Sequence, residues 1–184
     1  MSKINRRRFL KQSANSGAVA FPFVLTQLGQ AAKAPASERI RVGMVGAAGR
    51  AGKLSSLFAN NPNVEIAAIA EIDPRRLPKT LQGVTKIQGR KPKTTTDFRE
   101  LIDDPKIDAL CIGTPDHWHA IPTIYGCLAG KDVYVEKPDS HNIVEGHRMV
   151  QAMRKHKRII QMGSQHRSTE RMKTALAYVR EGHL

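Results

Sequence analysis

Short apolar runs alternate with longer amphipathic runs from Ile40 to Met162, and this alternation constrains the fold more than any other feature. We expect strands at 40–46, 64–73, 107–115, 132–138 and 158–163. We expect helices at 51–61, 97–104, 119–130 and 143–157. Strands separated by helices of this length form parallel βαβ units. The sequence therefore predicts an α/β domain with a doubly wound parallel sheet.

Two local features refine this prediction. Residues 88–96 are the most loop-like stretch of the body, and Asp97 with Glu100 three residues later has the spacing of a capping box. In an open parallel sheet, ligands bind outside the carboxyl ends of the strands. The candidate positions therefore follow the expected strands: 46–52, Glu71, 114–119, 136–138 and the residues from Gly163 onward.

The first of these positions resembles a dinucleotide fingerprint, which needs a strand before it and a helix after it. The segment aligns with G-x-G-x-x-G as Gly46-x-Ala48-x-x-Ala51. Ala48 departs from the pattern because its methyl group crowds a pyrophosphate, and Gly49 beside it restores clearance. The N–H groups that open the helix suit an anion. The cofactor-binding residues expected here are Gly46, Ala48, Gly49, Arg50 and Ala51.

Glu71 ends the second expected strand, 25 residues after Gly46. An acid at this place accepts hydrogen bonds from the ribose 2′-hydroxyl and repels a 2′-phosphate, which favours NAD over NADP. Arg75 and Arg76 follow closely and could reverse that preference, so NADP stays open. The alternative interpretation of Glu71 is an exposed acid at a strand end.

The stretch "TPDHWHA", residues 114–120, contains two histidines and the single tryptophan. A metal site needs three or four ligands, and His117 with His119 supplies two at an unhelpful spacing, so no metal is predicted. Base stacking needs several aromatic residues over a basic groove. Nine aromatic residues in the whole chain do not favour it. The position after a strand favours the edge of a cofactor pocket.

The formal net charge of +14 is unevenly distributed. Residues 1–34 contain six Lys or Arg and no acid, and residues 147–184 contain nine Lys or Arg and two Glu. The body between them is close to neutral, so no nucleic-acid partner is predicted, although a basic arm at 147–184 remains an alternative. Cys111 and Cys127 are expected as buried apolar residues rather than a disulfide.

The basic start, with Arg6, Arg7 and the residues "FLK" after them, resembles a twin-arginine export signal. Its apolar stretch, 18–28, is too short to span a bilayer, so no membrane span is predicted. We expect a signal peptide at 1–34, use of the twin-arginine export machinery and a periplasmic or exported protein. A disordered basic tail is the alternative.

The segments "RVGMVGAAGRAG", "TPDHWHA" and "VYVEKP" together resemble the glucose-fructose oxidoreductase and inositol dehydrogenase family, Gfo/Idh/MocA. "DFRELIDDPKIDALCIGTPDHWHA" and "KRIIQMGSQHRS" resemble its exported bacterial branch, and the resemblance covers 40–184. It implies a Rossmann-type domain at 36–163 that binds NAD(P). It also implies an oxidoreductase that acts on the CH–OH group of a sugar, polyol or glycoside.

The resemblance also assigns residues to roles. It implies that Thr114 and Pro115 border the cofactor, and that Trp118 and His119 lie beside the nicotinamide ribose. Lys137 is the implied catalytic residue, between nicotinamide and substrate, with a cis peptide bond before Pro138. The remaining implied contacts are Glu136 at the nicotinamide ribose or against Lys137, and, for the substrate, Gln165 and Arg167.

Family members continue into a substrate domain, and this resemblance makes 164–184 the start of a C-terminal substrate domain truncated after its first helix. That helix, 169–179, is then expected to expose Met172, Leu176 and Val179. The chain alone should bind dinucleotide without turnover, and the full-length form is expected to be a homo-oligomer. Two alternatives remain open: an NAD-dependent glycosidase that oxidises its sugar transiently, and a non-catalytic cofactor-binding fragment.

Overall fold

A computed structural model describes residues 38–165, 167 and 169–183. The expected signal peptide, 1–34, lies outside the described residues. The described part begins with β1 (Ile40–Val45), α2 (Gly49–Ala59), β2 (Val64–Ala70), the single turn η1 (Pro74–Arg76), α3 (Leu77–Gln88), β3 (Lys93–Thr95) and α4 (Arg99–Asp103). It continues with β4 (Ala109–Ile112), the turn η2 (Asp116–Trp118), α5 (Ala120–Leu128), β5 (Asp132–Val135), α6 (Ile143–His156), β6 (Ile160–Met162) and α7 (Glu170–Arg180).

The strands form one sheet in the order β3-β2-β1-β4-β5-β6, and every neighbouring pair is parallel. The predicted doubly wound α/β fold is therefore confirmed. The strand order reverses between β1 and β4, which is the topological switch point where such sheets bind ligands. All strands point their carboxyl ends to one edge, so the residues that follow them meet there.

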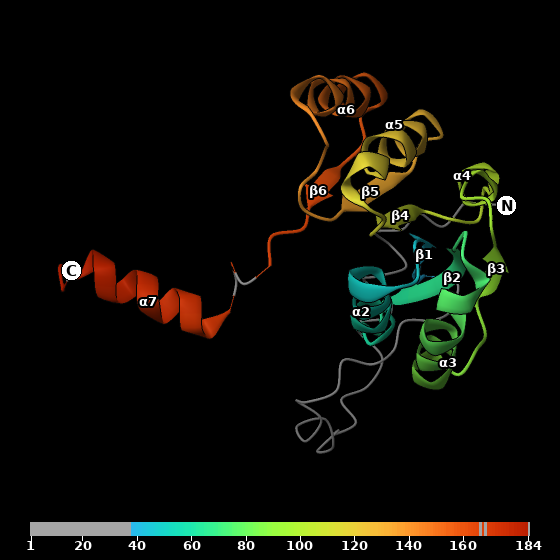
Figure 1. The fold of residues 1–184 in the computed structure, drawn as a ribbon, viewed down its shortest axis with the longest axis horizontal. Coiled ribbons are helices and arrows are strands. Elements are labelled where there is room, and N and C mark those ends of the chain that lie inside the picture. The colour runs from blue at the N-terminus through green and yellow to red at the C-terminus, as the bar shows by residue number, and fades with distance from the viewer. Residues whose placement is uncertain (1–37, 166, 168, 184) are drawn as a thin grey trace, which may run out of the picture. The chain divides into compact units, whose positions relative to one another are not determined.

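Two apolar layers cover the two faces of the sheet (Figure 1). On one face, α2 and α3 contribute Leu54, Ala59 and Val84 to a cluster with the strand residues Met44, Ile66, Ile69 and Cys111. On the other face, α4, α5 and α6 contribute Leu101, Cys127 and Met149 to a cluster with Leu110, Ile112, Val133 and Val135. Neighbouring residues of β4 alternate between the two clusters, as period-two strands buried on both faces must.

Both cysteines are free and buried, as predicted. Burial raises the pKa of Cys111 to about 12, which keeps the thiol protonated. Within the described residues, no helix combines the length and the apolar character needed to cross a membrane.

Three expectations were incomplete or wrong. The loop-like stretch 88–96 contains β3, a short polar edge strand that pairs with Ala68–Ala70 of β2. The helix α3 before it was not predicted. The capping box is also not formed, because Glu100 accepts a hydrogen bond from the Thr95 hydroxyl at 2.6 Å instead of from the Asp97 N–H. The Asp97 carboxylate accepts from the Arg99 N–H at 2.9 Å, and α4 begins at Arg99.

The helix α7 has the predicted extent within one residue. Met172, Leu176 and Val179 are 39, 47 and 49% exposed, so the expected exposure of this apolar set is confirmed.

Candidate functional site

The glycine loop between β1 and α2 has the backbone geometry that its sequence predicts. Gly46 has a φ of 98° and Gly49 a φ of 54°, both in the left-handed region that favours glycine. A Cβ at Gly46 would lie 3.2 Å from the Gly113 carbonyl oxygen, whereas a Cβ at Gly49 would meet nothing within 4 Å. The loop is therefore closed against β4 at Gly46 and open to a ligand at Gly49.

Ala51 fills the third position of the fingerprint. It is fully buried, and a Cβ on Gly113 would lie 2.8 Å from the Ala51 Cβ. The first turn of α2 thus packs on the end of β4, and a larger side chain at either position would separate them. Ala48 precedes the helix in an extended conformation, which leaves room at Gly49.

The N-terminus of α2 is suited to an anion. It has no side-chain cap and no acidic residue in its first turn, so within the described part of the chain no side chain caps its first N–H groups. These groups and the positive end of the helix dipole favour a phosphate. Arg50, in the same turn, adds a cation.

Arg50 spans the switch point. Its Nε donates to Glu136 Oε1 at 2.8 Å, 86 residues away in sequence. The Glu136 side chain is 4% exposed, and its other oxygen accepts from the Lys137 N–H at 3.2 Å and from Gln165 Nε2 at 3.4 Å. This contact engages the Lys137 backbone and not its side chain, so both roles implied for Glu136 stay predictions.

These contacts keep the carboxyl group of Glu136 ionised. Burial raises the pKa of its carboxyl group, but the hydrogen bonds from Arg50 and from the Lys137 N–H outweigh burial and leave the pKa below its ordinary value. The same hydrogen bond raises the pKa of Arg50. The pair is therefore a stable ion pair at neutral pH.

Glu71 lies beside the glycine loop, as predicted. Its two carboxylate oxygens accept from the backbone N–H groups of Ala47, at 2.8 Å, and Asp73, at 3.0 Å. The Thr80 hydroxyl donates to the Ala47 carbonyl at 2.6 Å and fixes the loop from the other side. Carboxylate oxygens have further lone pairs, so Glu71 can still accept from a ribose.

Asp73, which was not predicted as a site residue, holds both arginines that follow Glu71. It accepts from Arg75 Nε at 2.9 Å and Arg75 Nη2 at 3.0 Å, and from Arg76 Nε at 3.4 Å. The hydrogen bonds from Arg75 lower the pKa of Asp73 to about 2. The sequence signal was available, because an Asp before a proline favours a turn.

The segment 114–119 lies at the predicted edge. Thr114 is half-buried, and its hydroxyl oxygen is buried without a hydrogen-bond partner among the described residues. Pro115 is exposed, and Trp118 is 45% exposed and packs edge-to-face on Phe98. His119 is 2% exposed, and its ring nitrogens contact the carbonyl oxygens of Thr114 and Pro138.

Lys137 follows β5 at the same edge. Its peptide bond to Pro138 is cis, as expected. The side chain is exposed, and no hydrogen bond or ion pair engages its ammonium group within the described part of the chain. This ammonium group is therefore available to a ligand. Gln165 reaches Glu136, and Arg167 is exposed.

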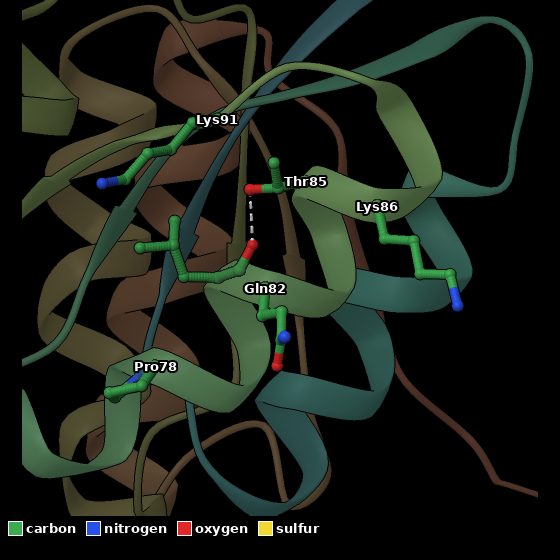
Figure 2. A pocket seen from close by; sticks show the side chains of 6 residues that line it. Pro78, Gln82, Thr85, Lys86 and Lys91 are labelled. Carbon is green, nitrogen blue, oxygen red and sulfur yellow. Dashed lines mark hydrogen bonds between the residues drawn. The ribbon is translucent and has the colours of Figure 1, made fainter.

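The described residues contain no cluster of three or more His, Cys, Asp or Glu that could hold a metal ion. Figure 2 shows a shallow groove on α3 and the segment before β3, where the Thr85 hydroxyl donates to the Leu81 carbonyl within the helix. This groove includes none of the expected site residues: its lining is Pro78, Leu81, Gln82, Thr85, Lys86 and Lys91.

The residues present fit a dinucleotide. Three features lie at the carboxyl edge of the sheet, after β1 or β4: the uncapped N-terminus of α2, the open space at Gly49 and the unpaired hydroxyl of Thr114. Lys137, whose ammonium group is free among the described residues, follows β5 at the same edge. The geometry provides an anion site, two ribose-binding candidates in Glu71 and Glu136, and the Lys137 ammonium group, which has no partner among the described residues.

Comparison with known proteins agrees with this arrangement. Residues 40–164 match the profile of the Gfo/Idh/MocA family, described as an oxidoreductase family with an NAD-binding Rossmann fold. A glycosyl hydrolase family 109 protein of Shewanella pealeana is 31% identical over 154 residues, 74% of this chain and 34% of that protein. A levoglucosan dehydrogenase of Pseudarthrobacter phenanthrenivorans is 38% identical over 90 residues, 48% of this chain and 23% of that protein.

Solved structures show the same fold. The crystal structure of scyllo-inositol dehydrogenase from Lactobacillus casei with bound NAD(H) and scyllo-inositol superimposes with a TM-score of 0.65 at 25% identity. The match covers 79% of this chain and 42% of that one. This chain spans only part of its curated relatives: it covers 34% of the length of the first and 42% of the length of the second.

The ion pair between Arg50 and Glu136 generates a prediction on stability. Arg50→Gln leaves a buried carboxylate without its charged partner and should lower the free energy of unfolding by about 2 kcal/mol at pH 7. Because pairing lowers the pKa of Glu136, the contribution is present above the carboxyl pKa of the unfolded chain and is lost as the pH falls through the folded value. Urea unfolding at several pH values measures this.

The control is Arg99→Gln, which removes a surface pair with Asp97 whose arginine side chain is 73% exposed. It should change the unfolding free energy by less than about 1 kcal/mol. Equal effects of the two variants, or an Arg50→Gln effect that does not shrink in acid, would contradict the assigned ion pair.

Proposed function

Because this chain belongs to the Gfo/Idh/MocA family of NAD-binding oxidoreductases, we propose that the protein transfers a hydride between NAD and the CH–OH group of a sugar, polyol or glycoside. The observation that carries the proposal is the unpaired ammonium of Lys137 at the same sheet edge as the uncapped N-terminus of α2. One edge thus offers a place for the pyrophosphate and a cation for the substrate.

Each residue has a physical task in this proposal. The N–H groups of Gly49, Arg50 and Ala51 hold the pyrophosphate, and Thr114 and Pro115 border the nicotinamide side. When bound, the nicotinamide ring takes or gives the hydride. Lys137 donates a hydrogen bond to the substrate hydroxyl and stabilises the negative charge that develops on its oxygen. Trp118 lies beside the nicotinamide ribose, and Gln165 and Arg167 contact the substrate.

The substrate class rests on the relatives. One is named as a levoglucosan dehydrogenase, and one solved structure contains scyllo-inositol together with NAD(H). The names of other relatives favour a second candidate function. Several are called glycosyl hydrolase family 109 proteins, and one from Shewanella oneidensis is called an alpha-N-acetylgalactosaminidase. In this second function, the same residues would oxidise a sugar transiently so that its glycosidic bond is cleaved without net redox change.

The preference for NAD over NADP is part of the proposal. The Glu71 carboxylate lies beside the glycine loop, where it would repel a 2′-phosphate. Arg75 and Arg76, the groups that could attract that phosphate, are both engaged by Asp73. This engagement supports NAD, because a guanidinium group that is already bidentate on a carboxylate has fewer donors left for a phosphate.

We also propose that further substrate contacts and the proton acceptor come from residues that the relatives carry beyond the matched part, and that the complete protein is a homo-oligomer. The proposed route of the protein is export by the twin-arginine machinery to the periplasm, on the resemblance of 1–34 to such a signal.

The cofactor preference is tested by titrating NAD and NADP into the purified chain. NAD should bind at least about tenfold more tightly, a margin of about 1.4 kcal/mol. Glu71→Ala should narrow the gap, and Asp73→Ala should narrow it further by releasing Arg75. Glu38→Ala, a substitution of an exposed acid before β1, serves as the control and should leave both affinities unchanged. Equal affinities for NAD and NADP in the wild type would refute the assignment to Glu71, and no binding of either would refute the function.

Turnover is tested by screening the 184-residue chain with sugars, polyols and glycosides. We expect saturable NADH binding, seen by nicotinamide fluorescence, and no turnover, because the proton acceptor is assigned to another segment. Steady NADH production would show that the acceptor lies within this chain. Release of free sugar from a glycoside without NADH accumulation would establish the glycosidase instead.

Export is tested by replacing Arg6 and Arg7 with lysine. Fractionation of the producing bacteria should then find the protein in the cytoplasm rather than the periplasm, because the twin-arginine machinery requires the pair. Normal passage of the Lys-Lys variant would indicate an ordinary signal or an uncleaved tail. The Lys-Lys replacement keeps both positive charges, so a loss of export would reflect the arginine pair itself. A Lys3→Gln variant, which changes a lysine outside the resembling segment, should be exported normally.

A further inference from the structure

His119 is a buried polar side chain that the proposed chemistry does not use. Its ring is 2% exposed, Nε2 lies 2.8 Å from the Thr114 carbonyl oxygen, and Nδ1 contacts the Pro138 carbonyl oxygen. Thr114 belongs to the turn after β4, and Pro138 to the segment after β5. One imidazole ring thus connects the two segments that carry the expected nicotinamide-side residues.

The backbone of His119 is fixed at the start of α5. His119 immediately precedes α5, and its carbonyl oxygen accepts from the Thr123 hydroxyl at 2.7 Å and from the Thr123 N–H at 3.4 Å. The helix therefore fixes the backbone at His119, and the contacts with the two carbonyl oxygens orient the ring.

The number of N–H groups on the imidazole ring decides how many of the two carbonyl oxygens it can hydrogen-bond. Both partners are carbonyl oxygens, which only accept hydrogen bonds. A neutral imidazole has one N–H and can donate to one of them, which leaves a nitrogen lone pair facing the other oxygen. A protonated imidazole donates to both. The connection is complete only in the charged form of the ring.

We propose that His119 is a positioning residue whose protonation completes a bridge between the Thr114 turn and the Lys137–Pro138 segment, so that the affinity for NAD follows the charge of this ring. The inference rests on the proposed function, because it concerns the same cofactor site. Histidine changes its charge between about pH 5 and 8. Acidification in this range adds the second donor and fixes Lys137 and Thr114 relative to each other before NAD binds.

Other charged groups lie on the segments around this bridge. Asp116 is 3.5 Å from His117 Nδ1 and 3.7 Å from His141 Nδ1, and these three side chains are exposed. Glu145 accepts from the His141 N–H at 2.9 Å, and Glu136 and Lys137 precede Pro138. His117 and His141 are further histidines on the two bridged segments, so the experiment needs a histidine control.

The experiment is a calorimetric titration of NAD into the full 184-residue chain at pH 6 and pH 8. The wild type should bind about fivefold more weakly at pH 8, the value expected for one hydrogen bond. His119→Asn should bind weakly at both pH values with little difference between them. The control variants His117→Asn and His141→Asn should keep the pH dependence of the wild type. An identical pH dependence in His119→Asn would overturn the proposal.

Nitrogen NMR of the wild-type chain, labelled at its histidines, measures the protonation of the two ring nitrogens of His119 directly. It needs no bound cofactor. Both ring nitrogens of His119 should carry protons at pH 6, and one should lose its proton by pH 8. A ring with one protonation state across this range overturns the proposal even if His119→Asn does not fold. Absence of NAD binding in the wild type would instead count against the proposed function, and the NMR result would still decide the bridge.

Discussion

All six strands of the sheet run in the same direction, and the rest of the site depends on this constraint. Parallel pairing places the residues after β1, β2, β4 and β5 at one edge, where Arg50 and Glu136 interact although they are 86 residues apart in sequence. The strand order reverses beside β1, and ligands of such sheets bind outside the strand ends at this point. Gly46, Glu71, Thr114 and Lys137 meet there because of topology rather than because of any contact among their side chains.

At that edge, the acidic and the basic side chain after β5 differ in burial. Glu136 is buried and satisfied by Arg50, whereas the Lys137 ammonium is exposed and unpaired within the described residues. Two neighbouring residues of opposite charge therefore do not neutralise each other. Burial of the acid behind an arginine leaves the lysine charge directed to a ligand, and the helix N-terminus adds further positive potential. The site as a whole is arranged to receive an anion.

The sequence predicted the elements whose patterns were strong and failed where tertiary contacts decide. The five predicted strands are apolar runs, whereas β3 consists of Lys93, Thr94 and Thr95 and is a strand only because it pairs with the edge of β2. The helix α3 contains Gly83 and two threonines, which weaken its helical signal. The candidate site residues were predicted from the strand ends and from the family resemblance.

The burial of His119 and the partners of Arg50 and Asp73 could not be predicted in the same way. His119 lies in a turn after a strand, a position that is typically exposed, and its burial involves contacts with Thr114 and with Pro138 of the next unit. Arg50 has no acid nearby in sequence, since its partner follows β5. Such contacts depend on the assembled sheet, which local periodicity does not describe.

The long sequence separation of the Arg50–Glu136 pair has a kinetic consequence. The pair joins the first βαβ half of the sheet to the second half across β4, so it can form only after both halves have docked. Loop-closure entropy must be overcome before such a contact contributes, and contacts of this kind are usually absent from the folding transition state. The pair therefore acts mainly on the unfolding rate: it prolongs the lifetime of the folded cofactor edge and leaves the speed of folding almost unchanged.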